Sequence, residues 1–219
     1  LLVDDELLRE VNQNTCVAVA TLANFGFAAP QQRVATVKTV PFAIPQAEFE
    51  ATRILLRQRG PILQGRPIRS PVVSVLYCDP LQGERARLMF EGIMRTRLER
   101  LGTGVSFVLT SLEEEAPVAR ALEHLLRHQP TVVLIASTTA PAGPSDAVGK
   151  AIERIGCKLE RFLAPVEPGN LLLLAYAGEI PVVAAPGCFR SPKPNVVDLL
   201  LPPLLARYRV SAAEVARLG

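Results

Sequence analysis

The chain has 219 residues, of which 49% are hydrophobic, and its formal net charge is +3. This composition supports a substantial core and excludes a disordered chain, while the modest charge gives no sign of a nucleic-acid partner. Aromatic residues make up only 5%, with no Trp, so few side chains could stack on the bases of a single strand. No apolar run reaches the roughly 20 residues of a membrane span, and no basic and apolar leader opens the sequence. We therefore expect a cytoplasmic protein without a nucleic-acid or membrane partner.

The first 70 residues predict a small α+β subdomain. Its expected elements are a short helix, two alternating strands and a second helix, at residues 4–12, 16–22, 33–40 and 47–60. The next stretch, residues 61–71, is rich in Pro, Gly and Arg and shows no apolar period. We interpret it as a linker and place a domain boundary near residue 70.

Beyond the linker, strands and helices alternate. The pattern predicts strands at residues 71–78, 105–110 and 131–137, and helices at residues 83–101, from 113 onward and 146–155. In the first helix we expect Leu88, Ile93 and Leu98 to face inward and the arginines outward. Ser111 is expected to cap the second helix, which begins with three acidic residues. This alternation is typical of a parallel sheet with helices on both faces.

Two more apolar runs, residues 171–176 and 180–185, read as buried strands that extend this sheet as a hairpin. A helix is predicted from residue 195 to 208, and a capping box at Ser211 and Glu214 begins another, so we expect the natural chain to continue beyond Gly219. The fold class is thus a three-layer α/β/α sandwich with a mostly parallel sheet over residues 71–219, preceded by the small α+β subdomain over residues 1–70. Ligands of such sheets bind outside the carboxyl ends of the strands.

Two Pro-Gly steps, Pro168-Gly169 and Pro186-Gly187, bracket the hairpin. Proline presets φ and glycine can take a positive φ, so each step predicts a tight reversal that leaves backbone N–H groups facing outward as a cradle for an anion. Further donors follow the steps, namely Asn170, Cys188, Arg190, Ser191 and Lys193. These segments indicate a phosphate or pterin pocket, with a hairpin of ordinary turns as the alternative.

A second candidate segment follows the strand at residues 131–137. It contains three consecutive hydroxyl residues, Ser137, Thr138 and Thr139, and then Gly143 and Asp146. The hydroxyls suit a phosphate and the acid suits a metal ion, although Asp146 is equally placed as a helix N-cap. Asp79, after the first strand of the sheet, belongs either to the same site or to an ordinary Asp-Pro turn.

Other metal and nucleotide motifs are not favoured. The four cysteines, at positions 16, 78, 157 and 188, form no Cys-x-x-Cys pair, so we interpret them as free, buried thiols. His124 and His128 lie four apart on a helix, either as a metal pair or as ordinary residues at a helix end. The sequence contains no P-loop, no Gly-x-Gly-x-x-Gly and no Gly-x-Ser-x-Gly elbow.

The segment PVEPGNLLLL…APGCFRSPKPN, together with VATVKTVPFAIP at residues 34–45, resembles the molybdopterin-binding domain of molybdenum-cofactor biosynthesis. This is the fold of molybdopterin adenylyltransferases and molybdenum insertases, and the chain is most similar to a bacterial branch in which the domain precedes a nucleotidyltransferase domain. The resemblance is strongest over residues 131–207 and continues weakly back to about residue 10.

The resemblance implies molybdopterin as the ligand. Its phosphate would be bound by Ser137, Thr138 and Thr139, and its pterin would be framed by the Pro-Gly segments. Asp146 falls on the acid that the enzymes of the family need, which implies a catalytic and Mg²⁺-binding role and, if transfer occurs, a nucleotide such as ATP or CTP. The implied partners are a nucleotidyltransferase domain or protein and further copies of the chain in a homo-oligomer.

The sequence departs from the family where Thr138 and Thr139 replace a pair of glycines, so the backbone cannot approach a ligand as closely. Two functions therefore stay open. One is molybdopterin binding that supports nucleotidyl transfer or metal insertion. The other is a non-catalytic regulatory or oligomerisation module that presents the cofactor to a nucleotidyltransferase.

Overall fold

A computed structural model describes residues 1–14, 16–39, 42–81, 83–139, 141 and 143–219. The chain forms two compact units, Leu1–Pro67 and Ile68–Gly219. Position 40, at the end of the second predicted strand, and positions 140 and 142, between the hydroxyl residues and Asp146, lie outside the described residues. In the described part of the chain, no helix is both long and apolar enough to cross a membrane.

The smaller unit contains two helices and two short antiparallel sheets. Its helices are α1 (Asp5–Asn12) and α2 (Gln46–Arg59), and its central hairpin pairs β2 (Val17–Thr21) with β3 (Ala35–Thr39). Within residues 61–71, which the sequence predicts as a linker, β4 (Leu63–Gln64) pairs with β1 (Leu2–Val3) and so belongs to the smaller unit. Neither two-residue strand has an apolar period, so this pairing of distant segments leaves no pattern in the sequence.

The larger unit is built on a six-stranded sheet with the order β6-β5-β7-β10-β9-β8. Its strands are β5 (Val73–Asp79), β6 (Phe107–Leu112), β7 (Val132–Ser137), β8 (Lys158–Phe162), β9 (Leu173–Ala177) and β10 (Ile180–Ala185). The neighbours β6, β5, β7 and β10 are parallel, while β9 runs antiparallel to both of its neighbours, β10 and β8. The mostly parallel sheet is therefore confirmed. Strand β8 was missed, because the KLERF sequence carries charges on a half-exposed edge.

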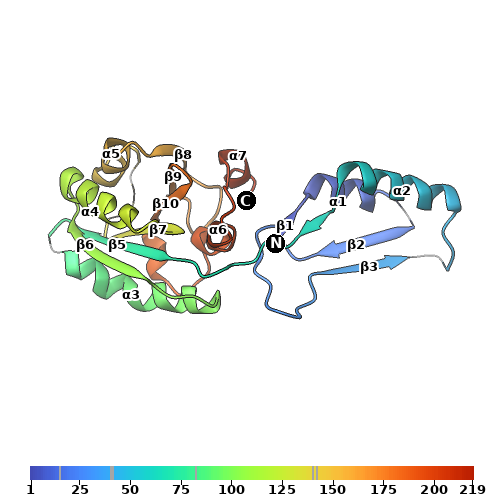
Figure 1. Ribbon diagram of the computed structural model, residues 1–219, viewed down its shortest axis with the longest axis horizontal. Coiled ribbons are helices and arrows are strands. Elements are labelled where there is room, and N and C mark those ends of the chain that lie inside the picture. Colours follow the sequence, from blue (N-terminus) through green and yellow to red (C-terminus); the bar gives the residue numbers. More distant parts are fainter. Residues whose placement is uncertain (15, 40–41, 82, 140, 142) are drawn as a thin grey trace. The chain divides into compact units, whose positions relative to one another are not determined.

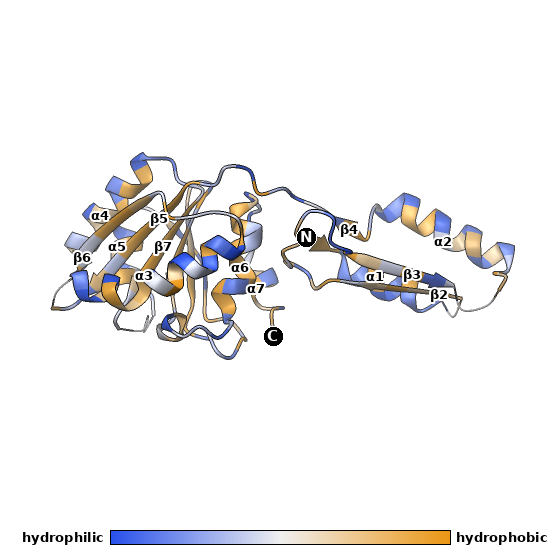
Figure 2. Ribbon diagram, turned by 90° about the horizontal axis from the view of Figure 1, so that it is seen from below, coloured by the Kyte–Doolittle hydropathy of each residue, from blue (hydrophilic) through white to orange (hydrophobic). Residues whose placement is uncertain are grey.

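Helices cover both faces of this sheet, which confirms the three-layer architecture (Figure 1). On one face α4 (Glu115–Arg127) and α5 (Ala147–Arg154) pack together over a core that includes Leu122, Ile135 and Val182. On the other face lie α3 (Gly83–Arg100) and α6 (Val196–Leu205), joined by an ion pair between Arg97 and Asp198. The central strands β5 and β7 are apolar along their length, as burial on both faces requires, and the helices are polar on their outer faces (Figure 2).

The orientation predicted for α3 was wrong in two places. Leu88 is 85% exposed, whereas Phe90, Met94 and Leu98 form the inner face. Arg97, expected to face outward with the other arginines, is only 4% exposed. The apolar period of this helix is weak because its sequence mixes arginines with leucines on both faces, so the inward side is decided by what packs against it.

The ends of the other helices agree with local capping chemistry in part. Asn195 begins α6 and Ser211 begins α7 (Ala212–Val215), each with a reciprocal capping box, so the predicted box at Ser211 is confirmed. Ser111 does not cap α4. It belongs to β6 and its hydroxyl donates to the Leu112 carbonyl, while Glu114 is the N-cap residue without a side-chain bond.

Two buried tyrosines predict loss of stability at alkaline pH. Burial raises the pKa of Tyr77 and of Tyr176 to about 12, from 10. Because the unfolded chain then loses protons that the folded chain retains, their contribution is complete below pH 10 and is lost as the pH rises towards 12. We expect the larger unit to lose about 2–4 kcal/mol over this interval, measured by urea unfolding at successive pH values.

The matched variant is Tyr77→Phe. The Tyr77 hydroxyl has no hydrogen-bond partner among the described residues, so its removal costs little at pH 8. Over this alkaline interval, the free energy of unfolding of the variant should fall less steeply than that of the wild type. Equal slopes would contradict the assignment of the decline to tyrosine ionisation.

Candidate functional site

The strand register brings the predicted site segments to one edge of the sheet. Cys78 on β5 pairs with Ser111 on β6 and with Ser137 on β7, and Ala136 pairs with Ala185 on β10. The strands β5, β6, β7 and β10 therefore all end at this edge, which we call the carboxyl edge. Antiparallel β9 begins there, since Leu173 pairs with Ala184. The segments around residues 79, 113, 137–146, 168–170 and 186–195 all leave the sheet at the carboxyl edge.

The hydroxyl loop, residues 137–146, is organised by a glutamate that the sequence analysis did not identify. The hydroxyls of Ser137 and Thr139 both donate to the carboxylate of Glu113, one to each oxygen. The two hydroxyl oxygens lie 3.2 Å apart. Glu113 stands between the end of β6 and the start of α4, and its backbone N–H donates to the Asp79 carbonyl at 2.9 Å. Its carboxylate is thus held against the hydroxyl loop.

Glu113 escaped prediction because it was assigned to the acidic first turn of the following helix. The position alone could have identified it, because a polar residue directly after a parallel strand lies at the edge where ligands bind. Its charge reaches neighbouring groups: burial and the Glu113 carboxylate together raise the pKa of the Cys78 thiol. The carboxyl edge is therefore more acidic than the sequence analysis assumed.

Asp79 and Thr138 form a second carboxylate–hydroxyl pair. The Asp79 side chain is fully buried, and its Oδ2 accepts from the Thr138 hydroxyl at 2.6 Å. Its Oδ1 accepts from the Leu81 backbone N–H at 2.8 Å, which is the turn contact expected of an Asp-Pro sequence. Arg85 Nε lies 3.9 Å from Oδ2. Asp79 therefore combines the turn role with a direct contact to the hydroxyl loop.

Asp146 serves as the N-cap of α5. Its Oδ1 accepts from the Gly149 N–H at 2.7 Å, and its Oδ2 is 3.4 Å from the Gly143 N–H. The helix-cap role, which the sequence offered as the alternative to a site role for Asp146, is thus present in the structure. The catalytic and Mg²⁺-binding roles implied by the resemblance stay predictions. Among the described residues, no three His, Cys, Asp or Glu side chains are grouped as metal ligands.

The Pro168-Gly169 step packs against the start of α6. Gly169 has φ +127°, and a Cβ added to it would lie 2.7 Å from Val196 Cγ1 and 2.8 Å from Val196 N. The carbonyl of Asn170 accepts from the N–H groups of Ala164 and Leu172, at 3.0 and 2.9 Å. The step makes the predicted positive-φ reversal, and its glycine is needed there for close packing.

The Pro186-Gly187 step differs from its prediction. Pro186 is the N-cap of a short 3₁₀ helix, η1 (Gly187–Arg190), so Gly187 begins a helical turn where a positive-φ reversal was expected. We call residues 186–195 the η1 segment. Its side chains at Arg190 and Lys193 are exposed, while Cys188 and Ser191 are half-buried. Burial raises the pKa of the Cys188 thiol.

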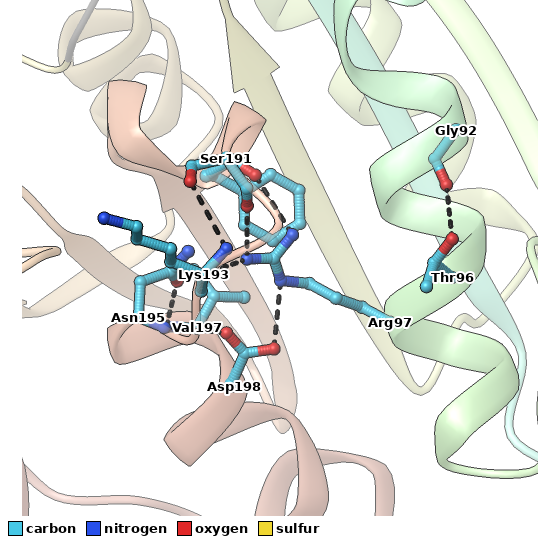
Figure 3. A network of polar contacts seen from close by, with 9 residues as sticks. Gly92, Thr96, Arg97, Ser191, Lys193, Asn195, Val197 and Asp198 are labelled. Carbon is cyan, nitrogen blue, oxygen red and sulfur yellow. Dashed lines mark hydrogen bonds and ion pairs between the residues drawn. The ribbon is translucent and has the colours of Figure 1, made fainter.

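Arg97 holds the η1 segment from the neighbouring helix (Figure 3). Its guanidinium donates to the carbonyls of Phe189, Ser191 and Lys193 at 3.1, 2.9 and 2.9 Å, and to Asp198 Oδ1 at 2.9 Å. It also lies over the Phe189 ring, 4.5 Å from the centroid. A planar fork with five donors suits this set of acceptors, which a lysine could not satisfy. The shape of the η1 segment is thus set by one buried cation.

The three consecutive hydroxyl residues of the loop do not fit the phosphate of molybdopterin, because Ser137, Thr138 and Thr139 already donate to Glu113 and Asp79 and a phosphate would meet two carboxylates there. The η1 segment fits an anion better, since it carries Arg190 and Lys193. For Mg²⁺, the residue predicted to bind it caps its own helix.

The remaining candidates from the sequence are the two histidines and the four cysteines. His124 and His128 pack against each other, with ring centroids 5.4 Å apart, and His128 stacks on Phe107 at 4.1 Å. The thiols of Cys78, Cys157 and Cys188 are free. The cysteines at positions 16, 78 and 157 are buried, as expected, whereas Cys188 is only half-buried.

The chain matches no known family model and no curated protein sequence. It resembles solved structures, of which two are described here. The molybdopterin biosynthesis moea protein from Pyrococcus horikosii is 19% identical over 69% of this chain, with a TM-score of 0.45, and the chain spans 38% of its length. The molybdopterin biosynthesis Mog protein from Mycobacterium ulcerans is 17% identical over 61% of this chain and 92% of its own length, with a TM-score of 0.37. The fold assignment rests on the strand order and register above.

Proposed function

We propose that the larger unit binds molybdopterin at the carboxyl edge and serves as a binding module in molybdenum-cofactor biosynthesis or maturation. One observation carries the proposal: the register brings the hydroxyl loop, the Pro168-Gly169 step and the η1 segment to the same edge. These are the segments that carry the resemblance to the molybdopterin-binding domain. Their convergence at the strand ends is what a ligand site in this architecture requires.

The proposal does not include catalysis. Asp146 directs its carboxylate at backbone N–H groups of its own loop and helix, and the hydroxyl groups of the loop contact Glu113 and Asp79. An adenylyl- or cytidylyl-transfer assay, with Asp146→Asn as the inactive reference, separates this binding role from nucleotidyl transfer. Transfer by the wild type that Asp146→Asn abolishes would make the chain an enzyme.

An assembly module is the second candidate. Strand β6 is an edge strand of the sheet, and its side chains Phe107, Val108 and Leu112 are 36%, 36% and 41% exposed. Exposed apolar side chains along an edge strand favour association with another chain. If assembly were the only function, sedimentation would show an oligomer and the folded chain would have no affinity for molybdopterin.

The proposal predicts that Thr139→Val combined with Asp146→Asn weakens molybdopterin binding at least about tenfold, since Thr139→Val removes an exposed hydroxyl group from the proposed site. Asparagine is as good an N-cap as aspartate, so α5 keeps its Gly149 contact and the fold is retained. Binding is measured by calorimetric titration of the full chain with molybdopterin.

The matched control is Thr103→Val. Thr103 lies in the connection that leads into β6, at the opposite edge of the sheet, and uses only its backbone N–H, which donates to the Leu98 carbonyl. It should bind like the wild type. Absence of binding by a folded wild-type chain would exclude the proposed function and leave assembly as the leading candidate.

A further inference from the structure

Three consecutive residues of the hydroxyl loop, Ser137, Thr138 and Thr139, have no side-chain donor left for a phosphate. A hydroxyl group carries one proton and two lone pairs. The hydroxyl groups of Ser137 and Thr139 donate hydrogen bonds to Glu113, and that of Thr138 donates to Asp79. All three side chains therefore present only lone pairs to a ligand, although hydroxyl residues in a loop are commonly taken as phosphate donors.

The backbone of the same loop adds no donor at Thr138 or Thr139. The Thr138 N–H donates to the Cys78 carbonyl at 3.1 Å, and the Thr139 N–H contacts Ser137 Oγ at 3.2 Å. Pro141 has no N–H to offer. At the described residues 138, 139 and 141, the loop therefore offers a ligand hydrogen-bond acceptors and no backbone donor.

The charges around the loop also oppose the binding of a phosphate. Asp79 and Glu113 contribute two carboxylates, and Glu84 accepts from the Thr110 hydroxyl on neighbouring β6 at 3.4 Å. A cation, Arg85, is also present, with its Nε 3.9 Å from Asp79 Oδ2 and its side chain 59% exposed. A phosphate dianion brought to the hydroxyl loop would lose its hydration and be repelled by this cluster.

We propose that the hydroxyl loop binds the hydrogen-bond-donating edge of the pterin ring, and that Glu113 is the residue that selects it. The inference rests on the proposed function and deepens it. The 2-amino group and the adjacent N3–H of a pterin form a pair of parallel donors, and a carboxylate with free lone pairs on both oxygens accepts such a pair.

The same assignment places the phosphate at the η1 segment. Arg190 and Lys193 there have exposed side chains, and Arg97 fixes the backbone that carries them. The ligand orientation is thus the reverse of the one that the resemblance implied, in which the hydroxyl residues bind the phosphate. The reason is the position of Glu113, which only the folded chain brings to the loop.

The test is a fluorescence titration of the full chain with two neutral heterocycles. The first is pterin (2-amino-4-oxopteridine), and the second is lumazine (2,4-dioxopteridine), in which a carbonyl replaces the amino donor. Inorganic phosphate is added as a competitor. The variants are Glu113→Gln and the matched control Glu114→Gln, whose side chain is exposed and makes no cap bond.

We expect the wild type and Glu114→Gln to bind pterin about tenfold or more tightly than lumazine, because a charged acceptor strengthens each hydrogen bond that it receives. Glu113→Gln should lose most of this preference. Phosphate should not displace pterin from the wild type. The ratio of the wild type's affinities for pterin and lumazine tests the inference even if a variant does not fold.

Three results separate the inference from the proposed function. If molybdopterin binds and phosphate displaces pterin from the wild type, or Glu113→Gln keeps the preference, the inference is overturned and the proposed function stands. If pterin binds with the expected dependence on Glu113 but molybdopterin does not bind, the proposed function fails and the selectivity of the loop stands. If a folded wild-type chain binds neither compound, both are overturned.

Discussion

Replacing Arg97 by methionine is expected to lower the free energy of unfolding of the larger unit by about 3–5 kcal/mol, the usual cost of removing one partner from a buried ion pair. The guanidinium is 4% exposed and donates to three carbonyls as well as to Asp198. Methionine fills much of the same volume but leaves these four acceptors without their donor. Burying them unpaired is what makes the substitution costly.

Tyrosine fluorescence during urea unfolding reports this change on the larger unit alone. The chain has no Trp and 3 tyrosines, Tyr77, Tyr176 and Tyr208, all within Ile68–Gly219. The matched control is Arg95→Met on the same helix, where the side chain is 65% exposed and 3.8 Å from Glu91. This control should change stability by no more than about 0.5 kcal/mol. Similar values for the two variants would show that the buried contacts of Arg97 contribute little.

The same substitution also tests the role of the η1 segment. If the segment binds the ligand, releasing its backbone should weaken molybdopterin binding in Arg97→Met even at temperatures where the variant is fully folded. Arg97→Lys keeps the charge but cannot reach four acceptors, so it should show an intermediate loss.

Gly169→Ala should be the second most damaging change, at about 2–4 kcal/mol, through strain at positive φ together with steric overlap. With φ at +127°, an alanine is strained at this position, and its Cβ would lie within 3 Å of both the side chain and the backbone nitrogen of Val196. Val196 is the first residue of α6, so relief of the overlap requires a shift of that helix. The measurement is again urea unfolding followed by tyrosine fluorescence.

Gly178→Ala separates the two causes. Gly178, in the turn between β9 and β10, has φ +60° and nothing within 4 Å of an added Cβ, so only the backbone strain remains. We expect a cost of about 1 kcal/mol for this variant. Equal costs at the two positions would mean that Val196 moves aside freely, and would contradict the close packing inferred at Gly169.

Local patterns predicted most of the elements of the larger unit. The apolar runs at β5, β7, β9 and β10 are buried on both faces, so nearly every residue must be apolar and the strand is visible in the sequence. The capping box at Ser211 is equally local, because both partners lie within four residues. Strand β8 and the β1–β4 pair were missed because edge or two-residue strands bury too little to leave a pattern.

The site was predicted less completely than the fold. The alternation of strands and helices determined by itself that the segments after β5, β7 and β10 would meet at one edge, since parallel strands end together. It did not determine which groups would meet there. Glu113 contacts residues 24 and 26 positions away, and Arg97 contacts the η1 segment 92 to 96 positions away.

Pattern and propensity describe what a residue does to its own segment, and they therefore placed Glu113 in a helix turn and Arg97 on a solvent face. Only tertiary packing decided that the glutamate would accept hydrogen bonds from hydroxyl groups of the loop and that the arginine would be buried against backbone carbonyls. The physical reason is that a polar group is directed by the partners available where the chain folds, and those partners come from other segments.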